Sequence, residues 1–380
     1  MTFPTRSSAY CCLVRDGPRN DSTTNDVKEV PPVPAAAVAE TATTTNTANT
    51  ANTANTAPAR GRRATARPAR SARPATSRPC TLWAVSDLHV HSQGNADIVD
   101  KYLRPPNPDD WLIVAGDVAE DIDTVVRTLA KLQQRYAHVI YTPGNHEIYA
   151  RSDDRLKGRA KYDALIHAVQ RLGVTTPEDP YVTFGDHTIV PLFTLYDHSW
   201  RAEGTTRDEA LAAAQESGVV LTDSFTVEPY VDVELWCRDR LKYSVRRLAS
   251  VSTPTILVNH WPLARETLKN VRYPEIGLWS GTRHTQNWPL RYRASTVIYG
   301  HLHIPVEIFV KNVTHAEVSL GYPREWKKSL PPRVDKKLWP YPVLTRTHDQ
   351  HRPTNLTNSA SIASPTDTTS TTNTDKEVTP

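Results

Sequence analysis

The sequence predicts an α/β sandwich, and two patterns in its central part lead to that prediction. Short apolar runs that end at polar or turn-forming residues recur along the chain, which is typical of buried strands. Longer stretches with apolar residues at helical spacing lie between several of these runs. This alternation of strands and helices favours a layered α/β fold over a helical bundle.

Five apolar runs are expected to form buried strands, at residues 82–86, 111–115, 138–142, 255–259 and 296–299. Two hairpins are also expected: residues 182–184 with 188–193, and residues 306–310 with 313–318. Their turns fall at Gly185-Asp186 and Lys311-Asn312, residue pairs that suit tight turns between strands.

Helices are expected at residues 122–136, 164–172 and 233–248. The first is the clearest, because Val125, Val126, Leu129 and Leu132 follow helical spacing; the other two show the same pattern more weakly. Residues 199–230 fit neither the strand nor the helix pattern. We expect this stretch to be an insertion over the functional site.

Both ends of the 380-residue chain differ in composition from its centre. Residues 22–79 have almost no large apolar side chains, and residues 43–56 form an imperfect repeat, TTTNTANTANTANT. Such a segment has too little apolar surface to offset the entropy of ordering. Thr, Asn and Ser dominate again after residue 347, whereas all nine Trp lie between. We therefore predict disordered tails at 1–79 and 346–380 around one catalytic domain at 80–345.

The formal charge of +4 is unevenly distributed, because residues 60–79 form a basic, Pro-rich run without an acidic residue. This run can be interpreted as a tether to nucleic acid or anionic membrane, or as a solvated tail. The absence of interleaved aromatic residues favours the tail. No apolar run reaches the roughly 18 residues of a membrane span. Four cysteines without CxxC spacing indicate a reducing compartment, so a cytoplasmic enzyme is expected.

Polar residues that can bind metal follow each of the five predicted strands. In chain order they are Asp87 and His89, then Asp117, then Asn145 and His146, then His260, and finally His301 and His303. Ligands in α/β sheets bind at the carboxyl ends of the strands, so these segments are expected to converge. One such block is explained by capping of a strand end, but five in order are not. Imidazole mixed with carboxylate suits Zn, Fe or Mn better than Ca or Mg.

The chemistry that fits this residue set is hydrolysis of a phosphate ester. Two cations about 3.5–4 Å apart neutralise the phosphate, lower the pKa of a bound water and align the displacement. A carboxylate between two cations can bridge them. The glycines Gly116, Gly144 and Gly300 let the chain turn sharply beside the metals.

These blocks, in this order across residues 87–303, resemble the calcineurin-like metallophosphoesterase superfamily. The segments at 272–273 and 320–325 also resemble uncharacterised bacterial members. The resemblance implies a four-layer αββα sandwich with a dinuclear centre at one edge. We expect residues 199–230 to shape access to that centre.

The resemblance implies a role for each matching residue. The first metal would be held by Asp87, His89 and His303, the second by Asn145, His260 and His301, with Asp117 bridging the two. His146 would not bind metal but would protonate the leaving group. In some relatives an acidic residue three positions after the bridging Asp orients this His, and Glu120 occupies that position.

The implied reaction is attack of a metal-bridging hydroxide on the phosphorus of a small phosphodiester or phosphomonoester, with a slight preference for diesters. Glu147 stands where many cyclic-nucleotide relatives have Asp, which weakens that substrate class. Two alternatives stay open. One is a nuclease that holds nucleic acid with its basic N-terminal arm, and the other is a binding scaffold, although no ligand is missing.

Several other polar residues have two interpretations each. His91 either touches substrate or is a solvated loop residue, and Asp197-His198 either line the pocket or do not. Arg272, Tyr273 and Arg283 either grip a phosphate or lie on the surface.

Overall fold

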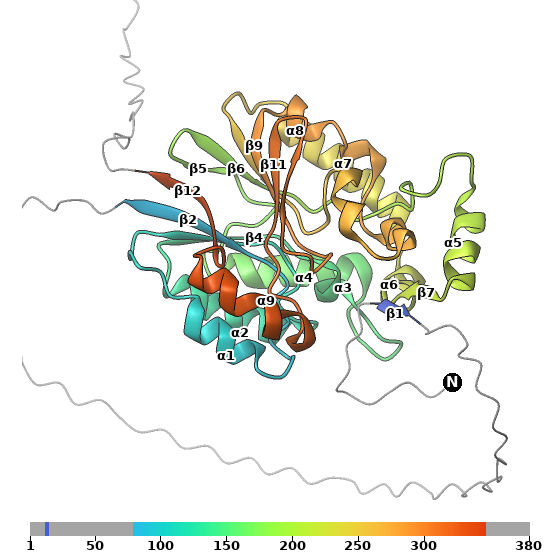
Figure 1. Ribbon diagram of the computed structural model, residues 1–380, viewed down its shortest axis with the longest axis horizontal. Coiled ribbons are helices and arrows are strands. Elements are labelled where there is room, and N and C mark those ends of the chain that lie inside the picture. Colours follow the sequence, from blue (N-terminus) through green and yellow to red (C-terminus); the bar gives the residue numbers. More distant parts are fainter. Residues whose placement is uncertain (1–11, 15–78, 347–380) are drawn as a thin grey trace, which may run out of the picture.

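The protein consists of two β-sheets packed face to face, with helices on both outer sides (Figure 1). The computed structural model describes residues 12–14 and 79–346. Helix, sheet, sheet and helix form four layers, so the predicted αββα sandwich is confirmed. The predicted tails lie outside the described residues except for 12–14, 79 and 346, and the division into tails and catalytic domain stays a prediction.

The first sheet has four strands in the order β12-β2-β3-β4. Three are parallel, and β12 pairs antiparallel with the outer side of β2. Their bounds are β2 Cys80–Val85, β3 Trp111–Val114, β4 His138–Tyr141 and β12 Tyr341–Arg346. The outer face is covered by α1 Asn95–Tyr102, α2 Ile122–Gln133, α4 Gly158–Gln170 and α9 Pro323–Asp335, which contribute Val99, Leu129, Leu165 and Leu330 to a shared core.

The second sheet has six strands in the order β10-β11-β9-β8-β6-β5. Their bounds are β5 Val182–Phe184, β6 His187–Pro191, β8 Thr255–Val258, β9 Ala294–Tyr299, β10 Glu307–Val310 and β11 Val313–Glu317. The inner four are parallel, and an antiparallel hairpin closes each edge. The hairpins turn where predicted, with positive φ at Gly185 (64°), Lys311 (50°) and Asn312 (65°).

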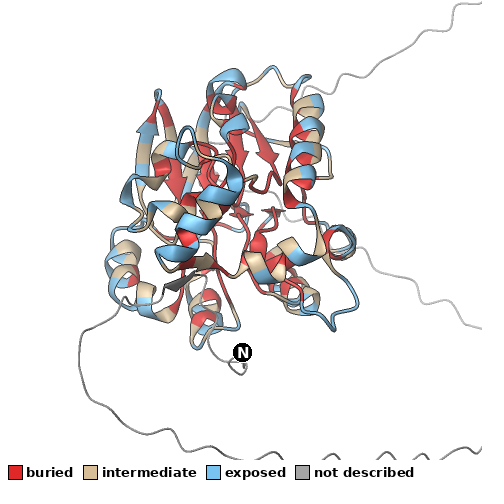
Figure 2. Ribbon diagram, turned by 90° about the vertical axis from the view of Figure 1, so that its right-hand side faces the viewer, coloured by how far each residue is buried: buried red, intermediate tan, exposed pale blue. Residues whose placement is uncertain are grey.

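A core of aliphatic side chains joins the two sheets. Leu82, Ile113, Ile140, Ile256 and Ile298 are at most 1% exposed and pack between the layers. Figure 2 shows the strands buried along most of their length, while the covering helices expose one side. Each buried side chain of this size contributes about 1.5–3 kcal/mol through the hydrophobic effect. The outer face of the second sheet is covered by α7 Val233–Leu248 and α8 Trp288–Arg291.

The predicted insertion at 199–230 has its own small elements: α5 Arg207–Glu216, β7 Val219–Leu221, α6 Asp223–Thr226 and the 3-10 turn Glu228–Tyr230. Strand β1, Cys12–Val14, pairs antiparallel with β7. Figure 1 shows α6 beside α3, Asn145–Ile148. A backbone hydrogen bond of 2.9 Å from Ala150 to Thr226 joins the two segments. The insertion therefore borders the segment that carries Asn145 and His146.

Three further 3-10 turns, Arg265–Asn270, Pro274–Trp279 and Arg283–Thr285, connect β8 to α8. None of the helices in the described part of the chain is long and apolar enough to cross a membrane.

Candidate metal centre

The loops after β2, β3, β4, β8 and β9 meet at one edge of the sandwich, because these strands are parallel within their sheets and end on the same side. The structure thus brings together the seven candidate metal ligands and His146. Asp87, Asp117, Asn145 and His260 are fully buried, and His89 and His301 are 5% and 6% exposed. The side chain of His303 is 8% exposed.

The backbone in these loops adopts conformations that non-glycine residues rarely use. Positive φ angles occur at Asp87 (52°), His89 (39°), Asp117 (55°), His301 (71°) and His303 (54°). Holding a non-glycine residue in this conformation costs free energy, and backbone strain of this kind concentrates at functional sites. Glycine is needed for a different reason at Gly144 and Gly300, because a Cβ there would collide with the carboxylates of Asp117 and Asp87.

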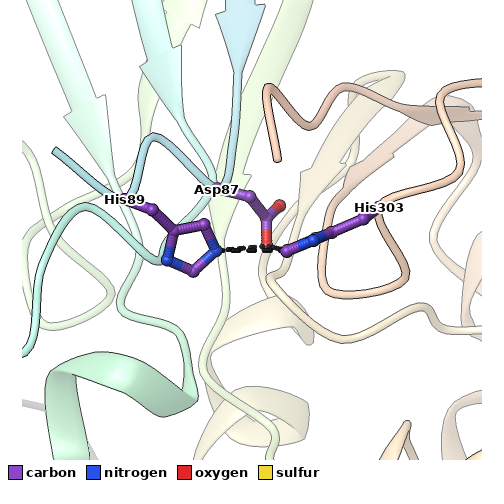
Figure 3. Close-up of side chains that lie close together, drawn as sticks. All are labelled: Asp87, His89 and His303. Atoms are coloured by element: carbon purple, nitrogen blue, oxygen red, sulfur yellow. Dashed lines mark hydrogen bonds and ion pairs between the residues drawn. The ribbon is translucent and has the colours of Figure 1, made fainter. Parts of the chain in front are cut away.

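Asp87, His89 and His303 form the first group of converging ligand atoms (Figure 3). His303 Nε2 lies 3.0 Å from Asp87 Oδ1 and 3.1 Å from His89 Nε2. His89 Nε2 is 3.8 Å from the same carboxylate oxygen. One carboxylate oxygen and two imidazole nitrogens thus point at one place, which suits a transition-metal cation.

Asn145, His260 and His301 form a second group. Asn145 Oδ1 lies 2.9 Å from His260 Nε2 and 3.1 Å from His301 Nδ1. His260 Nδ1 donates a hydrogen bond of 2.9 Å to the carbonyl of Ala115. That bond holds the proton on Nδ1, so Nε2 is the nitrogen that would bind a cation once it has lost its own proton.

Asp117 lies between the two groups. Its Oδ2 is 3.4 Å from His260 Nε2 and 3.9 Å from His89 Nε2. This oxygen is buried and makes no hydrogen bond within the described residues, and neither does His301 Nε2. A buried polar atom left without a partner costs about 1–3 kcal/mol. Cations on either side of Asp117 would satisfy its oxygen, so the residues present fit a dinuclear site.

The carboxyls of Asp87 and Asp117 are held in their ionised form. Burial alone would raise their pKa, but the facing imidazoles outweigh it and hold the pKa of both carboxyls well below the usual value. The main partners are His303 for Asp87 and His260 for Asp117. Ionised carboxylates are the form that binds cations.

His146 lies beside Asp117 and Glu120. Its Nε2 is 3.8 Å from Asp117 Oδ2, and its Nδ1 is 3.6 Å from Glu120 Oε1. Burial would lower the pKa of His146, but the charge of Asp117 and the hydrogen bond to Glu120 raise it. His146 also falls within a possible ligand group with His89 and Asp117. Contact with Glu120 on the other nitrogen favours the proton-donor role that the sequence analysis expects.

Three polar residues that the sequence analysis did not assign to the site support it from outside. Glu147 accepts backbone hydrogen bonds from Asp117 (2.9 Å) and from Val118 and Gly144 (both 2.7 Å), which fixes two ligand loops. Ser319 donates to Asp87 Oδ2 at 2.6 Å, and Glu325 Oε2 lies 2.8 Å from His303 Nδ1. Such partners orient metal ligands and tune their basicity.

Asp223, from the insertion, holds the Asn145 side chain. The amide nitrogen of Asn145 donates to Asp223 Oδ2 (3.0 Å) and to the hydroxyl of Tyr149 (2.8 Å). The Tyr149 hydroxyl in turn donates to the same Asp223 oxygen at 2.7 Å. Both amide hydrogens are therefore used, which turns the amide oxygen toward His260 and His301.

Replacing Asp223 with alanine is expected to weaken binding of the second metal equivalent by about 10–100-fold, because the Asn145 amide loses the acceptor that orients it. Titration calorimetry with Mn²⁺ would measure this. The variant Asp208→Ala, on exposed helix α5 of the same insertion, should bind metal like wild type. Unchanged affinity in Asp223→Ala would show that Tyr149 suffices.

The other candidate residues divide into those near the site and those elsewhere. A cavity of about 150 Å³ lies beside His301 and His303, and Arg272 and Tyr273 line it together with Ile276 and Arg324. Arg283 is not among its lining residues.

Asp197-His198 does not line that cavity either. His198 is buried and lies 3.1 Å from Glu228 and 3.3 Å from Glu234, and Asp197 accepts a hydrogen bond from Thr282. His91 is exposed and forms an ion pair of 2.7 Å with Asp121. The side chains of Asp197 and His198 thus pair with residues outside this cavity, and a pocket-lining role for Asp197-His198 stays a prediction.

The chain matches the family described as calcineurin-like phosphoesterase over residues 80–305. It belongs to that family. It is 45% identical over 262 residues to the [acyl-carrier-protein] phosphodiesterase PptH of Mycobacterium tuberculosis, over 66% of this chain and 81% of the relative. It is 44% identical to the crystal structure of phosphopantetheinyl hydrolase (PptH) from the same species, with a TM-score of 0.64 over 67% of this chain and 93% of that chain.

Other solved structures are much less similar to this chain. A putative 5'-nucleotidase from Staphylococcus aureus is 13% identical, with a TM-score of 0.34 over 64% of this chain and 49% of that chain. The family match and the PptH relative confirm that this chain is an enzyme, a metal-dependent phosphoester hydrolase with the metallophosphoesterase fold. The scaffold alternative is therefore excluded.

Proposed function

We propose that this enzyme is a phosphodiesterase that removes the phosphopantetheinyl group from an acyl carrier protein. The observation that carries this proposal is the 45% identity to PptH, which extends over 81% of that relative. The names of this relative specify both the carrier protein and the phosphopantetheinyl group. The proposal replaces the small phosphate ester expected from the sequence with a protein-linked diester.

Two cations are proposed at the site, with Asp87, His89 and His303 on one, Asn145, His260 and His301 on the other, and Asp117 between them. Supporting this are the three overlapping ligand groups within 4.8 Å and the unpaired Asp117 oxygen. The imidazole-rich donor set favours Mn, Fe or Zn. When bound, such cations neutralise the phosphate and lower the pKa of water.

The protein's own contribution is to place a proton at the leaving group. His146 carries the proton on Nε2, and the carboxylate of Glu120, 3.6 Å from Nδ1, stabilises the protonated imidazole by its charge. The hydroxyl of Tyr322 lies 3.4 Å from His146 Nε2, and its ring stacks on His89 at 4.5 Å. These contacts hold the imidazole in one orientation, so the proton is delivered to one oxygen of the ester.

The test is to compare the metal-free and Mn²⁺-loaded full chain on holo-acyl carrier protein, bis-p-nitrophenyl phosphate and p-nitrophenyl phosphate. Mass spectrometry of the carrier protein should show metal-dependent loss of phosphopantetheine, and the diester should be cleaved faster than the monoester. Turnover of the diester without change in the carrier protein would assign the enzyme to another phosphodiester.

We also propose a cytoplasmic location, which is supported by Cys80 and Cys237, two buried free thiols. The nuclease alternative depends on residues 60–79, which lie outside the described residues except for Pro79. A chain that starts at residue 80 and keeps full activity toward the carrier protein would leave that arm without a catalytic role.

A further inference from the structure

Exposed basic side chains border the cavity at the metal centre. Arg272 and Arg324 are exposed and line this cavity, which also contacts His301 and His303. Lys327 and Lys328 follow Arg324 by one helical turn on α9 and are exposed as well. We call Arg272, Arg324, Lys327 and Lys328 the basic rim.

The packing of α9 explains why these side chains face solvent. Leu330, with Trp326 and Val334 four residues to either side, packs against the core below the first sheet. Residues three and four apart share one face of a helix, so Arg324 and Lys328 point away from this packed face, while Lys327 lies at its margin; all three are exposed. Figure 1 shows α9 in the helical layer with α1 and α2.

The rim is joined to the metal centre through the first turn of α9. Glu325 Oε2 lies 2.8 Å from His303 Nδ1 and accepts a 2.8 Å hydrogen bond from the backbone of Tyr322. The Glu325 carboxylate is thus turned toward the site. Within residues 79–346, neither Lys327 nor Lys328 takes part in an ion pair. Their positive charge is therefore not neutralised by a neighbouring side chain.

A protein substrate imposes a geometric condition on this edge of the molecule. The candidate ligands are buried and the cavity holds about 150 Å³, so a folded carrier protein cannot enter. Its surface around the modified residue must lie against the mouth of the cavity while the phosphodiester reaches inward. Complementary charge across such a contact steers association and fixes orientation.

Resting on the proposed function, we propose that the basic rim is the docking surface for the carrier protein and binds an acidic patch beside its phosphopantetheinyl group. Arg272 and Arg324 line the cavity itself, and Lys327 and Lys328 extend the contact along α9. An exposed basic surface of this kind affects substrate association rather than the chemical step.

The experiment measures kcat and KM for phosphopantetheine release from holo-acyl carrier protein, together with hydrolysis of bis-p-nitrophenyl phosphate. The test variant is Lys327→Glu with Lys328→Glu. The matched control is Lys242→Glu with Arg246→Glu, which makes the same charge change at exposed positions of α7 on the opposite outer layer. The test variant is expected to raise KM for the carrier protein about tenfold while kcat and diester hydrolysis stay at the wild-type level.

The dependence of KM for the carrier protein on ionic strength is a second test of the basic rim. Because salt screens exposed charges, raising the ionic strength from about 0.1 to about 1 M should raise KM in the wild type and in the control more than in the test variant. An unchanged KM in the test variant, or an equal rise of KM in the control, would show that the basic rim is not the docking surface. The proposed function would remain in place.

Two other results would also overturn the inference. If the wild-type enzyme cleaves bis-p-nitrophenyl phosphate but releases nothing from the carrier protein, the carrier protein is not the substrate. The docking role of the basic rim is then wrong as well. If the lysine pair governs cleavage of single-stranded RNA or DNA and not release from the carrier protein, the rim is a nucleic-acid surface.

Discussion

Replacing Asp117 with asparagine is expected to reduce metal-dependent turnover by at least about 10³-fold, equivalent to roughly 4 kcal/mol of transition-state stabilisation. Asp117 Oδ2 lies between His89 on one side and His260 on the other, and the substitution removes the charge shared by both groups. An amide cannot bridge two cations as a carboxylate does. Steady-state rates on bis-p-nitrophenyl phosphate, with metal content measured by mass spectrometry, would report the loss.

The matched control is Asp110→Asn. Asp110 is buried and lies just before the start of β3, the strand that Asp117 follows. Asp110 accepts hydrogen bonds from the Thr81 backbone and the Trp83 indole, so this variant should lose some thermal stability and keep its turnover. Asp117→Asn enzyme that binds two equivalents of metal and turns over at the wild-type rate would contradict the bridging role.

The strands and the ligands could be predicted because both signals are local. Each of the five apolar runs is found as a strand, and the ligands follow it within a few residues. A polar residue at the end of a parallel strand reaches the same edge as its neighbours, whatever connects the strands. The sequence therefore predicts the converging set Asp87 to His303 without knowledge of the tertiary contacts.

The elements that were missed lack such a local signal. Helix α9 contains Pro331 and Pro332, and its intrinsic preference argues against a helix, but packing of Leu330 against the first sheet overrides it. Strand β12 is only partly buried and lacks a continuous apolar run, so its pairing with β2 is visible in the fold alone. Helix α1 buries only Val99 among its apolar residues and has no clear periodicity.

The residues that support the ligands were missed because their contacts are distant in sequence. Asp223 is 78 residues from Asn145, and Ser319 is 232 residues from Asp87. Neither follows a strand with a recognisable motif. Their roles depend on how the insertion and the β11–α9 connection pack onto the site, which sequence spacing does not encode. Arg272 and Tyr273 were selected as candidates, but only the cavity shows that they lie beside His301 and His303.

Replacing His146 with alanine is expected to lower kcat for carrier-protein cleavage by about 10²–10⁴-fold, the usual contribution of a general acid. The reason is that an alkoxide leaving group needs a proton, and His146 Nε2 beside Asp117 is placed to supply it. For bis-p-nitrophenyl phosphate the loss should be much smaller, because p-nitrophenolate leaves without protonation. Rates of wild type and His146→Ala on the two substrates, measured side by side, show how far the loss depends on the leaving group. Glu120→Gln should show a weaker form of the same leaving-group dependence, since Glu120 acts by contact with Nδ1 of His146.

Metal content decides between the two roles that the geometry allows for His146. A proton donor can be removed without loss of metal, whereas a ligand cannot, so His146→Ala should keep the wild-type metal stoichiometry. Loss of one metal equivalent in His146→Ala, with equal rate losses on both esters, would instead make His146 a ligand, as its position in a group with His89 and Asp117 permits. The proton for the leaving group would then have to come from another residue, and the Tyr322 hydroxyl is the neighbour in reach.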